Sequence, residues 1–377
     1  MRRKTVLICL DGLDPDYLET ARTPTLDAIA RAGFFTIGRA VLPSVTNVNN
    51  VSLLTGSFPE THGIASNYWY DPVTGQGQFI ETAEYLRAPT ALECAAQAGL
   101  RTALLVTKEK LLRLLGRGAT VAFSAERPPA EAIEAVGEPA GIYSAEIDYW
   151  QLRALHWVLR AYDPDLTYCS TTDYVMHNYG PGSAEAIRHI ETLDALLGDL
   201  LAAFPEHQVL ITADHGMRDK TVGLDLVALL GGYGIRAAFV PPIKDRYVVH
   251  HSNMGGAGYL YLPAGQVADA IELLRETAGI EAVYSREEAV NRFRLPADRI
   301  GDLFVLATTE TVLVEPGSTG STRASVRLRS HGGLHETRVP IWGCRAEASG
   351  EQFAWNLDIV RLLDLPGLPE SRAATSS

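Results

Sequence analysis

Charged side chains follow several short apolar runs of this 377-residue sequence. Asp11 comes after KTVLICL, Lys108 after RTALLVT, Asp173 after LTYCSTT, and Asp214 and His215 after QVLITA. Such runs are typical of buried parallel strands, and ligands bind beyond the carboxyl ends of these strands. Any single aspartate could instead be a turn or helix-cap residue. Because several carboxylates at one edge would repel each other, the sequence predicts a positive group among them.

A divalent metal ion is the positive group that these residue types favour. Asp173 and His177 are one helical turn apart, so they share a face if their segment is helical. Asp214 and His215 are adjacent, so both reach one site only from a turn. Carboxylate and imidazole suit Zn²⁺, Mn²⁺ or Fe²⁺ better than Mg²⁺ or Ca²⁺. Taken singly, each histidine could equally be a structural residue.

Spacing alone does not select further histidine ligands. Four histidines in the second half of the chain stay open as candidates: His250, His251, His331 and His335. The sequence slightly favours His331, because SHGG places it in a glycine-rich loop where a backbone can approach closely.

The stretch PSVTNVNN offers a candidate nucleophile, Thr46. A metal that bound its hydroxyl would lower the hydroxyl pKa and make it nucleophilic without a histidine base. The alternative is structural: Thr46 or Asn47 would cap a helix that begins near Asn49 and runs through VSLLTG. Both can hold together, since the positive end of a helix dipole also favours a phosphoryl group.

Lys108 and Lys110 flank Glu109 directly after a predicted strand. In an extended segment, residues two apart point the same way, so both ammonium groups could bind a substrate carboxylate or phosphate. The alternative is a solvated charge run that opens the helix KEKLLRLLG. The two residues alone favour this alternative.

Strand-like and helical segments alternate around these residues. Helical patterns occur in TPTLDAIARAG, APTALECAAQAG, DYWQLRALHWVLRAY and SAEAIRHIETLDALLGDLLAAF, between the strand-like runs. This alternation predicts an α/β fold with a mostly parallel sheet sandwiched by helices.

The pattern changes to shorter, mixed elements after Pro241 and Pro242. We therefore predict an inserted α+β cap at 241–306 and a core formed by 1–240 and 307–377. After a Gly/Ser/Thr-rich connection, VRLRSHGG and VPIWGC are predicted to return to the main sheet. The tail LPGLPESRAATSS is predicted to be disordered.

Composition limits the partners and the compartment. The formal net charge of -12 argues against a nucleic acid partner, but not against a small anionic substrate. No apolar stretch reaches a membrane span, and MRRKTVLICLDG is too short in its apolar part for a signal peptide. We expect a soluble cytoplasmic protein without a membrane partner, and a homodimer stays open. The widely spaced cysteines are predicted to be buried free thiols: Cys9, Cys94, Cys169 and Cys344.

Together these residues resemble the alkaline phosphatase superfamily. The matching motifs are LDG at Asp11, PSVTNVNN at Thr46, DYVMH at Asp173 and His177, ADHGM at Asp214 and His215, and SHGG at His331. They span nearly the whole chain. Within the superfamily the sequence is most similar to the phosphonoacetate hydrolases, relatives of the nucleotide pyrophosphatase/phosphodiesterases. The stretches YLRAPT, TKEKLLRLLG and STTDYVMH favour the phosphonate enzymes over the phosphodiesterases.

The resemblance implies an alkaline phosphatase-like core with a cap, and two zinc ions, with Mn²⁺ or Fe²⁺ as alternatives. One implied zinc site comprises Asp11, Thr46, Asp214 and His215. The other comprises Asp173, His177 and His331.

The resemblance also implies catalytic and substrate-binding roles. Thr46 would attack phosphorus, and Asn67, in ASNYWYD, would donate a hydrogen bond to a phosphoryl oxygen. Lys108 and Lys110 would hold the substrate carboxylate. The implied reaction is hydrolysis of the C–P bond of phosphonoacetate to acetate and phosphate through a phosphothreonine.

Other functions stay open at this point. A phosphodiesterase, nucleotide pyrophosphatase or phosphomonoesterase could use the same two-metal scaffold, and a phosphonate or phosphate sensor would keep the ligands without a reactive Thr46. A haloacid dehalogenase-type phosphohydrolase, suggested by LICLDGLDPD, needs a second Asp where Leu13 stands. One departure from the family pattern is MHNYGPGS, where Asn178 and Tyr179 replace a more basic segment beside His177.

Overall fold

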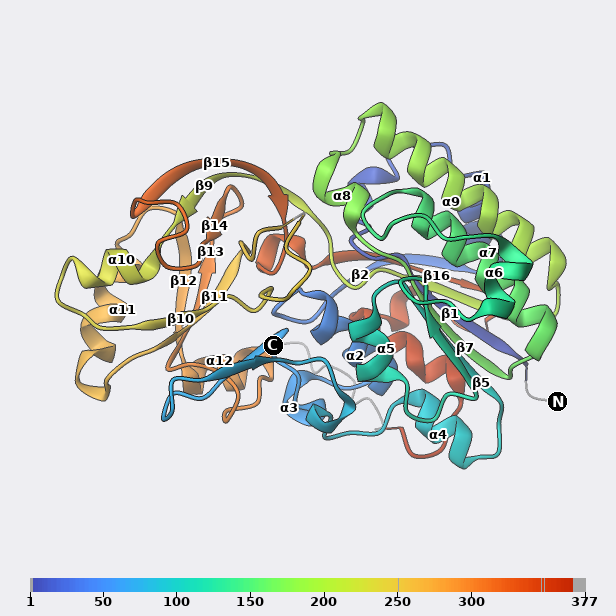
Figure 1. Ribbon diagram of the computed structural model, residues 1–377, viewed down its shortest axis with the longest axis horizontal. Helices are drawn as coiled ribbons and strands as arrows, with labels where there is room; N and C mark the ends of the chain where they lie inside the picture. Colours follow the sequence, from blue (N-terminus) through green and yellow to red (C-terminus); the bar gives the residue numbers. More distant parts are fainter. Residues whose placement is uncertain (1–2, 250, 347, 349, 369–377) are drawn as a thin grey trace.

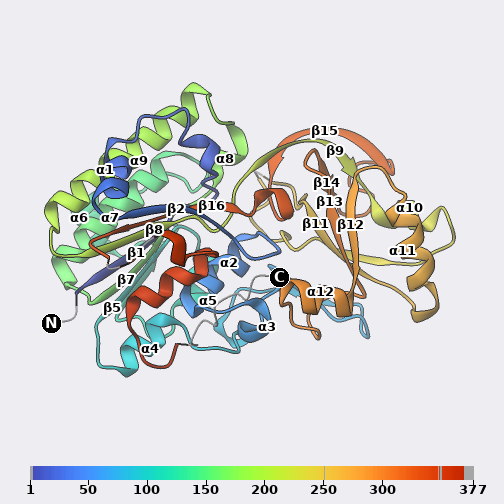
Figure 2. The same ribbon diagram turned by 180° about the vertical axis from the view of Figure 1, so that it is seen from behind.

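The computed structural model describes residues 3–249, 251–346, 348 and 350–368. Figure 1 shows two lobes: a larger one in which helices cover a central sheet, and a smaller one built mainly of strands. The same division is visible from behind in Figure 2. The ligand candidate His250 and residues 369–377 of the predicted disordered tail lie outside the described residues.

The larger lobe contains a seven-stranded sheet in the order β2-β16-β8-β1-β7-β5-β6. β8, β1, β7, β5 and β6 run parallel, whereas β16 is antiparallel to both β8 and β2. The predicted α/β fold with a mostly parallel sheet is therefore confirmed. The bounds of the strands are β1 Thr5–Cys9, β2 Phe34–Arg39, β5 Thr102–Val106, β6 Val121–Ser124, β7 Leu166–Ser170, β8 Gln208–Thr212 and β16 Arg338–Cys344.

Helices cover both faces of this sheet because its central strands are apolar on both sides. In β1, Val6 and Ile8 join the core on one face, and Leu7 and Cys9 join the core on the other. The first face is covered by α1 (Pro24–Ala32), α6 (Ala130–Val136), α7 (Glu146–Tyr162) and α9 (Ala184–Ala203). The second is covered by α2 (Thr46–Thr55), α4 (Ala91–Gln97), α5 (Glu109–Leu115) and the 3-10 helix η6 (Asn356–Leu363).

The smaller lobe contains two further sheets. One has four strands in the order β10-β11-β13-β12, and the other has three strands in the order β14-β9-β15. The strands are β9 Arg218–Leu224, β10 Ala238–Val240, β11 Ala257–Tyr261, β12 Ile280–Ser285, β13 Leu303–Ala307, β14 Thr311–Leu313 and β15 Arg323–Ser330. The helices of this lobe are α10 Leu226–Gly231, α11 Val267–Arg275 and α12 Arg286–Phe293.

The strand assignment corrects part of the sequence prediction. β9 and β10 precede residue 241 and β14 and β15 follow residue 306, yet all four belong to the smaller sheets. The segment VRLRS, predicted to return to the main sheet, lies in β15 and pairs with β9 instead. Only VPIWGC, in β16, returns. A strand pattern reveals burial but not the partner strand, which packing selects. The division into a core and a cap stays a prediction.

Shorter elements connect the larger ones. They are η1 Pro15–Tyr17, α3 Pro59–His62, β3 Tyr68–Tyr70, β4 Gly77–Phe79, η2 Ala83–Tyr85, α8 Tyr174–Asn178, η3 Ala264–Gln266, η4 Leu334–Glu336 and η5 Gly350–Gln352. The four cysteines are buried free thiols, as predicted. Among the described residues, no helix combines the length and the apolar character that a membrane crossing requires.

Candidate metal centre and active site

Three neighbouring strands bring three aspartates to one edge of the main sheet. β1 lies between β7 and β8, and Asp11, Asp173 and Asp214 stand shortly after the ends of β1, β7 and β8. Each side chain is almost completely buried. The structure therefore brings together carboxylates that the sequence places far apart.

A first group of candidate ligands surrounds His215. The ligand atoms of Asp11, Asp214 and His215 all lie within 4.8 Å of one another. His215 Nε2 is 3.4 Å from Asp11 Oδ1 and 3.5 Å from Asp214 Oδ2. The Thr46 hydroxyl is 3.3 Å from the same nitrogen. All four residues of the first implied zinc site thus gather in one place.

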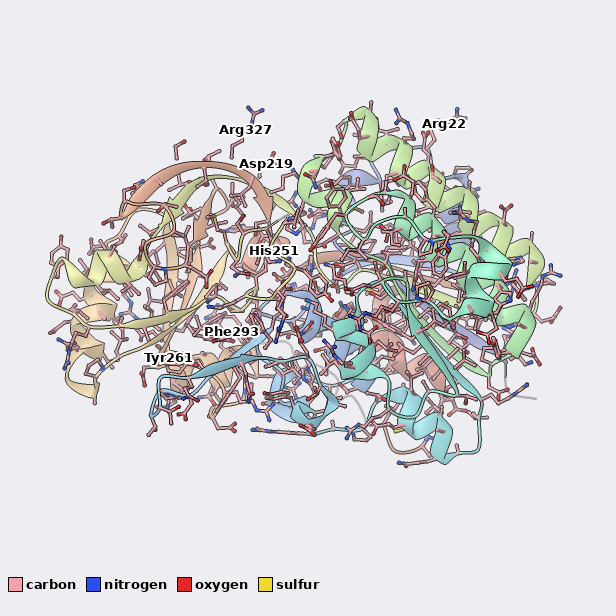
Figure 3. All side chains as sticks on the ribbon, viewed as in Figure 1. Arg22, Asp219, His251, Tyr261, Phe293 and Arg327 are labelled. Carbon is pink, nitrogen blue, oxygen red and sulfur yellow. The ribbon has the colours of Figure 1, made fainter. Side chains whose placement is uncertain are left out.

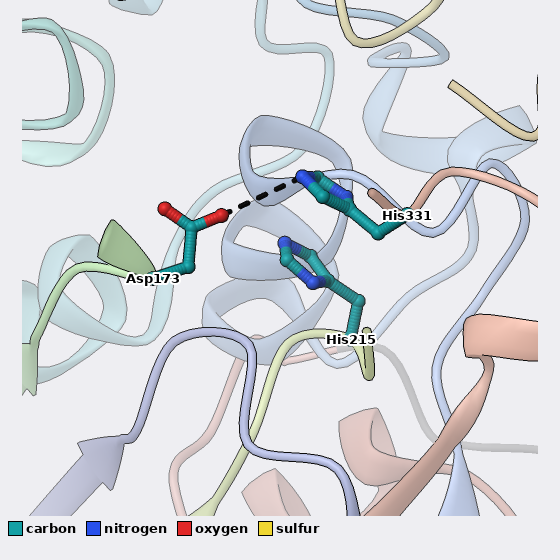
Figure 4. Close-up of side chains that lie close together, drawn as sticks. All are labelled: Asp173, His215 and His331. Atoms are coloured by element: carbon teal, nitrogen blue, oxygen red, sulfur yellow. Dashed lines mark ion pairs between the residues drawn. The ribbon is translucent and has the colours of Figure 1, made fainter. Parts of the chain in front are cut away.

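A second group, drawn in Figure 4, shares His215 with the first. Asp173, His215 and His331 also offer ligand atoms within 4.8 Å of one another, and His331 Nε2 is 3.5 Å from Asp173 Oδ2. α8 starts after Asp173, so His177 is one turn further on the same face, with Nε2 2.9 Å from Asp173 Oδ2. The rings of His215 and His331 stack with centroids 3.6 Å apart. The two groups are therefore contiguous.

The three histidines are oriented in the same way. In His177, Nδ1 lies 2.8 Å from the carbonyl oxygen of Arg329. In His215, Nδ1 lies 3.0 Å from the carbonyl oxygen of Gly216, and in His331 it lies 2.8 Å from that of Ser44. A carbonyl oxygen can only accept, so each Nδ1 carries a proton and donates it. Nε2 is then left to act as a ligand, which is the usual arrangement of metal-binding histidines.

The electrostatics of the centre also fit a cation. Burial, together with Asp173 and Asp214 close by, raises the pKa of Asp11 well above its usual range, and Asp11 Oδ1 makes no hydrogen bond to the described residues. Burial and His215 lower the pKa of His331 well below its usual range, so this ring is neutral. Neutral imidazoles and crowded carboxylates are the donor set that divalent zinc, manganese or iron accepts. We conclude that the residues fit metal ions.

Thr46 does not have the capping role that was its structural alternative. α2 begins at Thr46 and not near Asn49, and its N-cap residue, Val45, makes no side-chain cap hydrogen bond. The Thr46 hydroxyl therefore points towards His215 instead of satisfying the helix end. Asn50, one turn along α2, donates to Asp214 Oδ2 at 3.1 Å and accepts from the Tyr168 hydroxyl at 2.7 Å. The helix start thus presents a hydroxyl and supports a candidate ligand.

Asn67 lies at the same helix start. Its Oδ1 accepts from the backbone N–H of Asn47 at 3.3 Å, and its Nδ2 donates to the Ile243 carbonyl at 3.3 Å. An amide nitrogen has two N–H groups, and the bond to Ile243 uses one of them. This position is compatible with the role that the resemblance implies for Asn67.

The extended segment that was considered for Lys108 and Lys110 ends at Lys108, whose backbone is extended (φ -100°, ψ 135°). Lys108 is the N-cap residue of α5 and Lys110 lies within its first turn, so the helical alternative describes the backbone. The two side chains nevertheless converge, because each Nζ is 5.5 Å from the centroid of the Tyr247 ring. They are not a solvated charge run, since they are 4% and 2% exposed. Lys108 Nζ is also 3.6 Å from Asp173 Oδ1 at the metal centre.

The other two described histidine candidates, His251 and His335, differ in their distance from the metal centre. His251 lies between the two lobes (Figure 3), with its ring centroid 5.8 Å from that of His177 and its Nε2 3.4 Å from Asp245 Oδ1. His335 lies away from the centre and pairs with Glu281. Neither belongs to the two ligand groups found among the described residues.

The segment that departs from the family pattern lies near the surface. Asn178 donates back to the Tyr174 carbonyl, and Tyr179 is 37% exposed. Sequence reasoning assigned no role to Asp245 or Tyr247, because neither follows a strand of the main sheet. Arg329 was also missed, although it stands two residues before His331, which is the one signal that could have found it.

The chain is similar to a known family and to several known proteins. The family model described as "Type I phosphodiesterase / nucleotide pyrophosphatase" matches residues 5–334. An uncharacterised pyrophosphatase/phosphodiesterase of Schizosaccharomyces pombe is 28% identical over 232 residues, covering 56% of this chain and 44% of that protein. Human ectonucleotide pyrophosphatase/phosphodiesterase family member 1 is 26% identical over 233 residues, covering 56% and 23%. The chain thus spans less than half of the length of these relatives.

Solved structures cover more of the chain. Phosphonoacetate hydrolase from Sinorhizobium meliloti 1021, crystallised with phosphonoformate and with phosphonoacetate, is 33% identical with a TM-score of 0.88, covering 96% of this chain and 95% of that one. Murine ectonucleotide pyrophosphatase/phosphodiesterase 5 shares the fold at 18% identity and a TM-score of 0.72, covering 98% and 97%. The chain belongs to the type I phosphodiesterase/nucleotide pyrophosphatase family, on an alkaline phosphatase-like fold.

Proposed function

We propose that this protein is a zinc-dependent hydrolase that cleaves the C–P bond of phosphonoacetate to give acetate and phosphate. One observation supports this substrate above others: two buried lysines, Lys108 and Lys110, converge beside the metal centre. The similarity to the Sinorhizobium meliloti phosphonoacetate hydrolase points the same way. A phosphodiester with an uncharged leaving group would leave both cations without a role.

The metal ligands follow from the two groups. One zinc ion would be held by Asp11, Thr46, Asp214 and His215, and the other by Asp173, His177 and His331. When bound, the ions would supply Lewis acidity, polarising the phosphonyl oxygens and lowering the pKa of oxygen ligands. Mn²⁺ or Fe²⁺ could serve the same donor set.

In the proposed mechanism, the Thr46 hydroxyl gives up its proton to water, its oxygen attacks phosphorus, the C–P bond breaks, and a phosphothreonine forms. The electron pair of the broken bond passes to the acetate carbon and is delocalised onto the carboxylate as an enediolate. Lys108 and Lys110 hold this carboxylate and stabilise charge that develops in the transition state. Protonation of the carbon gives acetate, and water then hydrolyses the phosphothreonine to phosphate and Thr46. Asn67 donates a hydrogen bond to a phosphoryl oxygen.

A direct assay tests the reaction. Phosphate release from phosphonoacetate by the zinc-loaded protein should be much faster than p-nitrophenol release from bis(p-nitrophenyl) phosphate, with acetate and phosphate formed in equal amounts. Preference for the diester would move the protein to the phosphodiesterases, the second candidate, which the curated relatives favour. Binding without multiple turnovers would favour a sensor.

Variants test the roles of the residues. Thr46→Ala should abolish turnover while zinc content is retained, and full activity would exclude the covalent mechanism. Thr55→Ala is a matched control, because Thr55 is a buried threonine at the other end of α2 that bonds to Val51 and Ser57. Replacing Lys108 or Lys110 should impair phosphonoacetate turnover far more than hydrolysis of an aryl ester. Equal losses would argue against the carboxylate role.

A further inference from the structure

A loop of the smaller lobe, residues 241–256 between β10 and β11, places a carboxylate against the lysine pair. Asp245 Oδ2 is 2.5 Å from Lys110 Nζ, and neither side chain is more than 5% exposed. Two residues later, the Tyr247 ring lies beside both lysine ammonium groups. The lysine pair therefore already has a negative partner before any substrate binds.

The two lysines differ in what balances their charge. The carboxylate nearest Lys108 is that of Asp173, but Asp173 belongs to a ligand group and its charge would be shared with a cation. Asp245 belongs to neither ligand group found among the described residues. Its acid oxygens face Lys110 and His251. Lys108, Lys110 and Asp245 together thus carry one net positive charge.

Asp245 is held in a fixed position and is ionised. Its Oδ1 accepts the backbone N–H of Tyr247 at 2.6 Å, and its own N–H is donated to Asn253 Oδ1 at 3.1 Å. Burial acts to raise the pKa of Asp245, but Lys110 and His251 outweigh burial and hold the pKa well below its usual range. The negative charge is therefore present at neutral pH and cannot move away from Lys110.

We propose that Asp245 is a specificity-determining residue that limits the leaving group to a single carboxylate. A leaving group with one carboxylate matches the single net positive charge of the lysine pair and Asp245. A second carboxylate would meet Asp245 with no further cation to balance it, and like charges in a buried site repel strongly. This inference rests on the proposed function, because it assumes that the lysines bind the leaving group.

Binding of three phosphonates tests the inference without requiring their turnover. Methylphosphonate, phosphonoacetate and 2-phosphonosuccinate carry none, one and two carboxylates beside the same phosphonate. Each is measured as a competitive inhibitor of aryl phosphate ester hydrolysis by the metal-loaded protein. Asp245→Asn should improve the inhibition constant of phosphonosuccinate relative to that of phosphonoacetate by about tenfold, since it adds one net positive charge. An unchanged ratio would overturn the inference.

A control separates charge from loop anchoring. Asp245→Asn keeps an oxygen that can accept the Tyr247 N–H, whereas Glu315→Gln removes the adjacent Lys244–Glu315 ion pair (2.6 Å) of the same loop. Glu315→Gln should leave the inhibitor ratio unchanged. The same ratio shift in Glu315→Gln, or equal weakening of all three inhibitors by Asp245→Asn, would assign Asp245 to anchoring only. Failure of the proposed function shows separately, as wild-type protein that releases no phosphate from phosphonoacetate.

Discussion

Acid should destabilise this protein through His62, which supports the helix that presents Thr46. The His62 side chain is fully buried. Its Nδ1 accepts the backbone N–H of Ile64 at 3.1 Å, so Nε2 carries the proton and donates to Ser52 Oγ on α2 at 2.8 Å. Burial and the nearby Arg299 lower the pKa of His62 to about 3. Protonating Nδ1 would place two N–H groups against each other and a charge in the core.

The sign and size of the effect follow from linkage. The ordinary pKa of a histidine is 6.5, whereas that of His62 in the fold is about 3, so the unfolded chain binds the proton more readily. Stability is fully present above the unfolded pKa and falls as pH drops towards the folded pKa. Between about pH 7 and about pH 5, His62 alone should remove about 2 kcal/mol from the free energy of unfolding.

The assay is urea denaturation of wild type and His62→Gln at both pH values. Gln cannot titrate, and its Nε2 can still donate to Ser52. Other acid-sensitive groups, such as His189 with its pKa lowered to about 4 by burial, contribute to both proteins and cancel in the comparison. The variant should therefore lose about 2 kcal/mol less than wild type on acidification. Equal losses in the two proteins would refute the reasoning.

Three further predictions concern the metal centre and the buried charges. A chelator should lower the melting temperature, because the crowded carboxylates would repel each other once the metal is removed. Added Zn²⁺ should restore the melting temperature, and an unchanged value would contradict the metal assignment. Lys220→Met should lower the free energy of unfolding, measured by urea denaturation, by about 3–5 kcal/mol, because it leaves the buried carboxylate of Glu336 without the ammonium group that lies 2.7 Å away. The double variant Lys220→Met/Glu336→Leu should lose less, and additive losses would contradict a coupled pair. Arg329→Lys should weaken zinc binding by about 10–100-fold in a chelator competition. The reason is that the Arg329 guanidinium donates to the carbonyl of Met176, the residue before His177, at 2.8 Å. Unchanged zinc affinity would show that Arg329 does not position His177.

The main sheet and the edge that carries the candidate ligands could be predicted because their signals are local. Apolar runs such as TVLIC identify strands that are buried on both faces, and a polar residue such as Asp11 marks where each run ends. Parallel strands end at the same edge, so the convergence of Asp173 and Asp214 with Asp11 follows from the fold class alone. The one-turn spacing of Asp173 and His177 likewise needed only a helix in the right place.

Features that depend on partners distant in sequence could not be predicted. The pattern of β15 identified a strand but not β9 as its partner, so the segment was assigned to the wrong sheet. An extended backbone through both Lys108 and Lys110 was the basis on which they were expected to point the same way. Only Lys108 is extended, Lys110 lies in α5, and both ammonium groups lie near the Tyr247 ring. No sequence pattern identifies Asp245, because its importance comes from the Lys110 ammonium group, which only the packing of the folded chain places beside it.

Residues of both lobes form the candidate metal centre. His331 directly follows β15 of the smaller lobe, and its Nδ1 donates to the Ser44 carbonyl, two residues before Thr46. Ser44 bonds back through its N–H to Gly332 at 3.3 Å and through its hydroxyl to Gly333 at 2.7 Å. The loop that presents the candidate nucleophile is therefore fixed by the loop that carries a candidate metal ligand. Because Asp245 comes from the same lobe, any displacement of that lobe would move the candidate ligand His331, the loop that precedes Thr46 and the carboxylate beside Lys110 together.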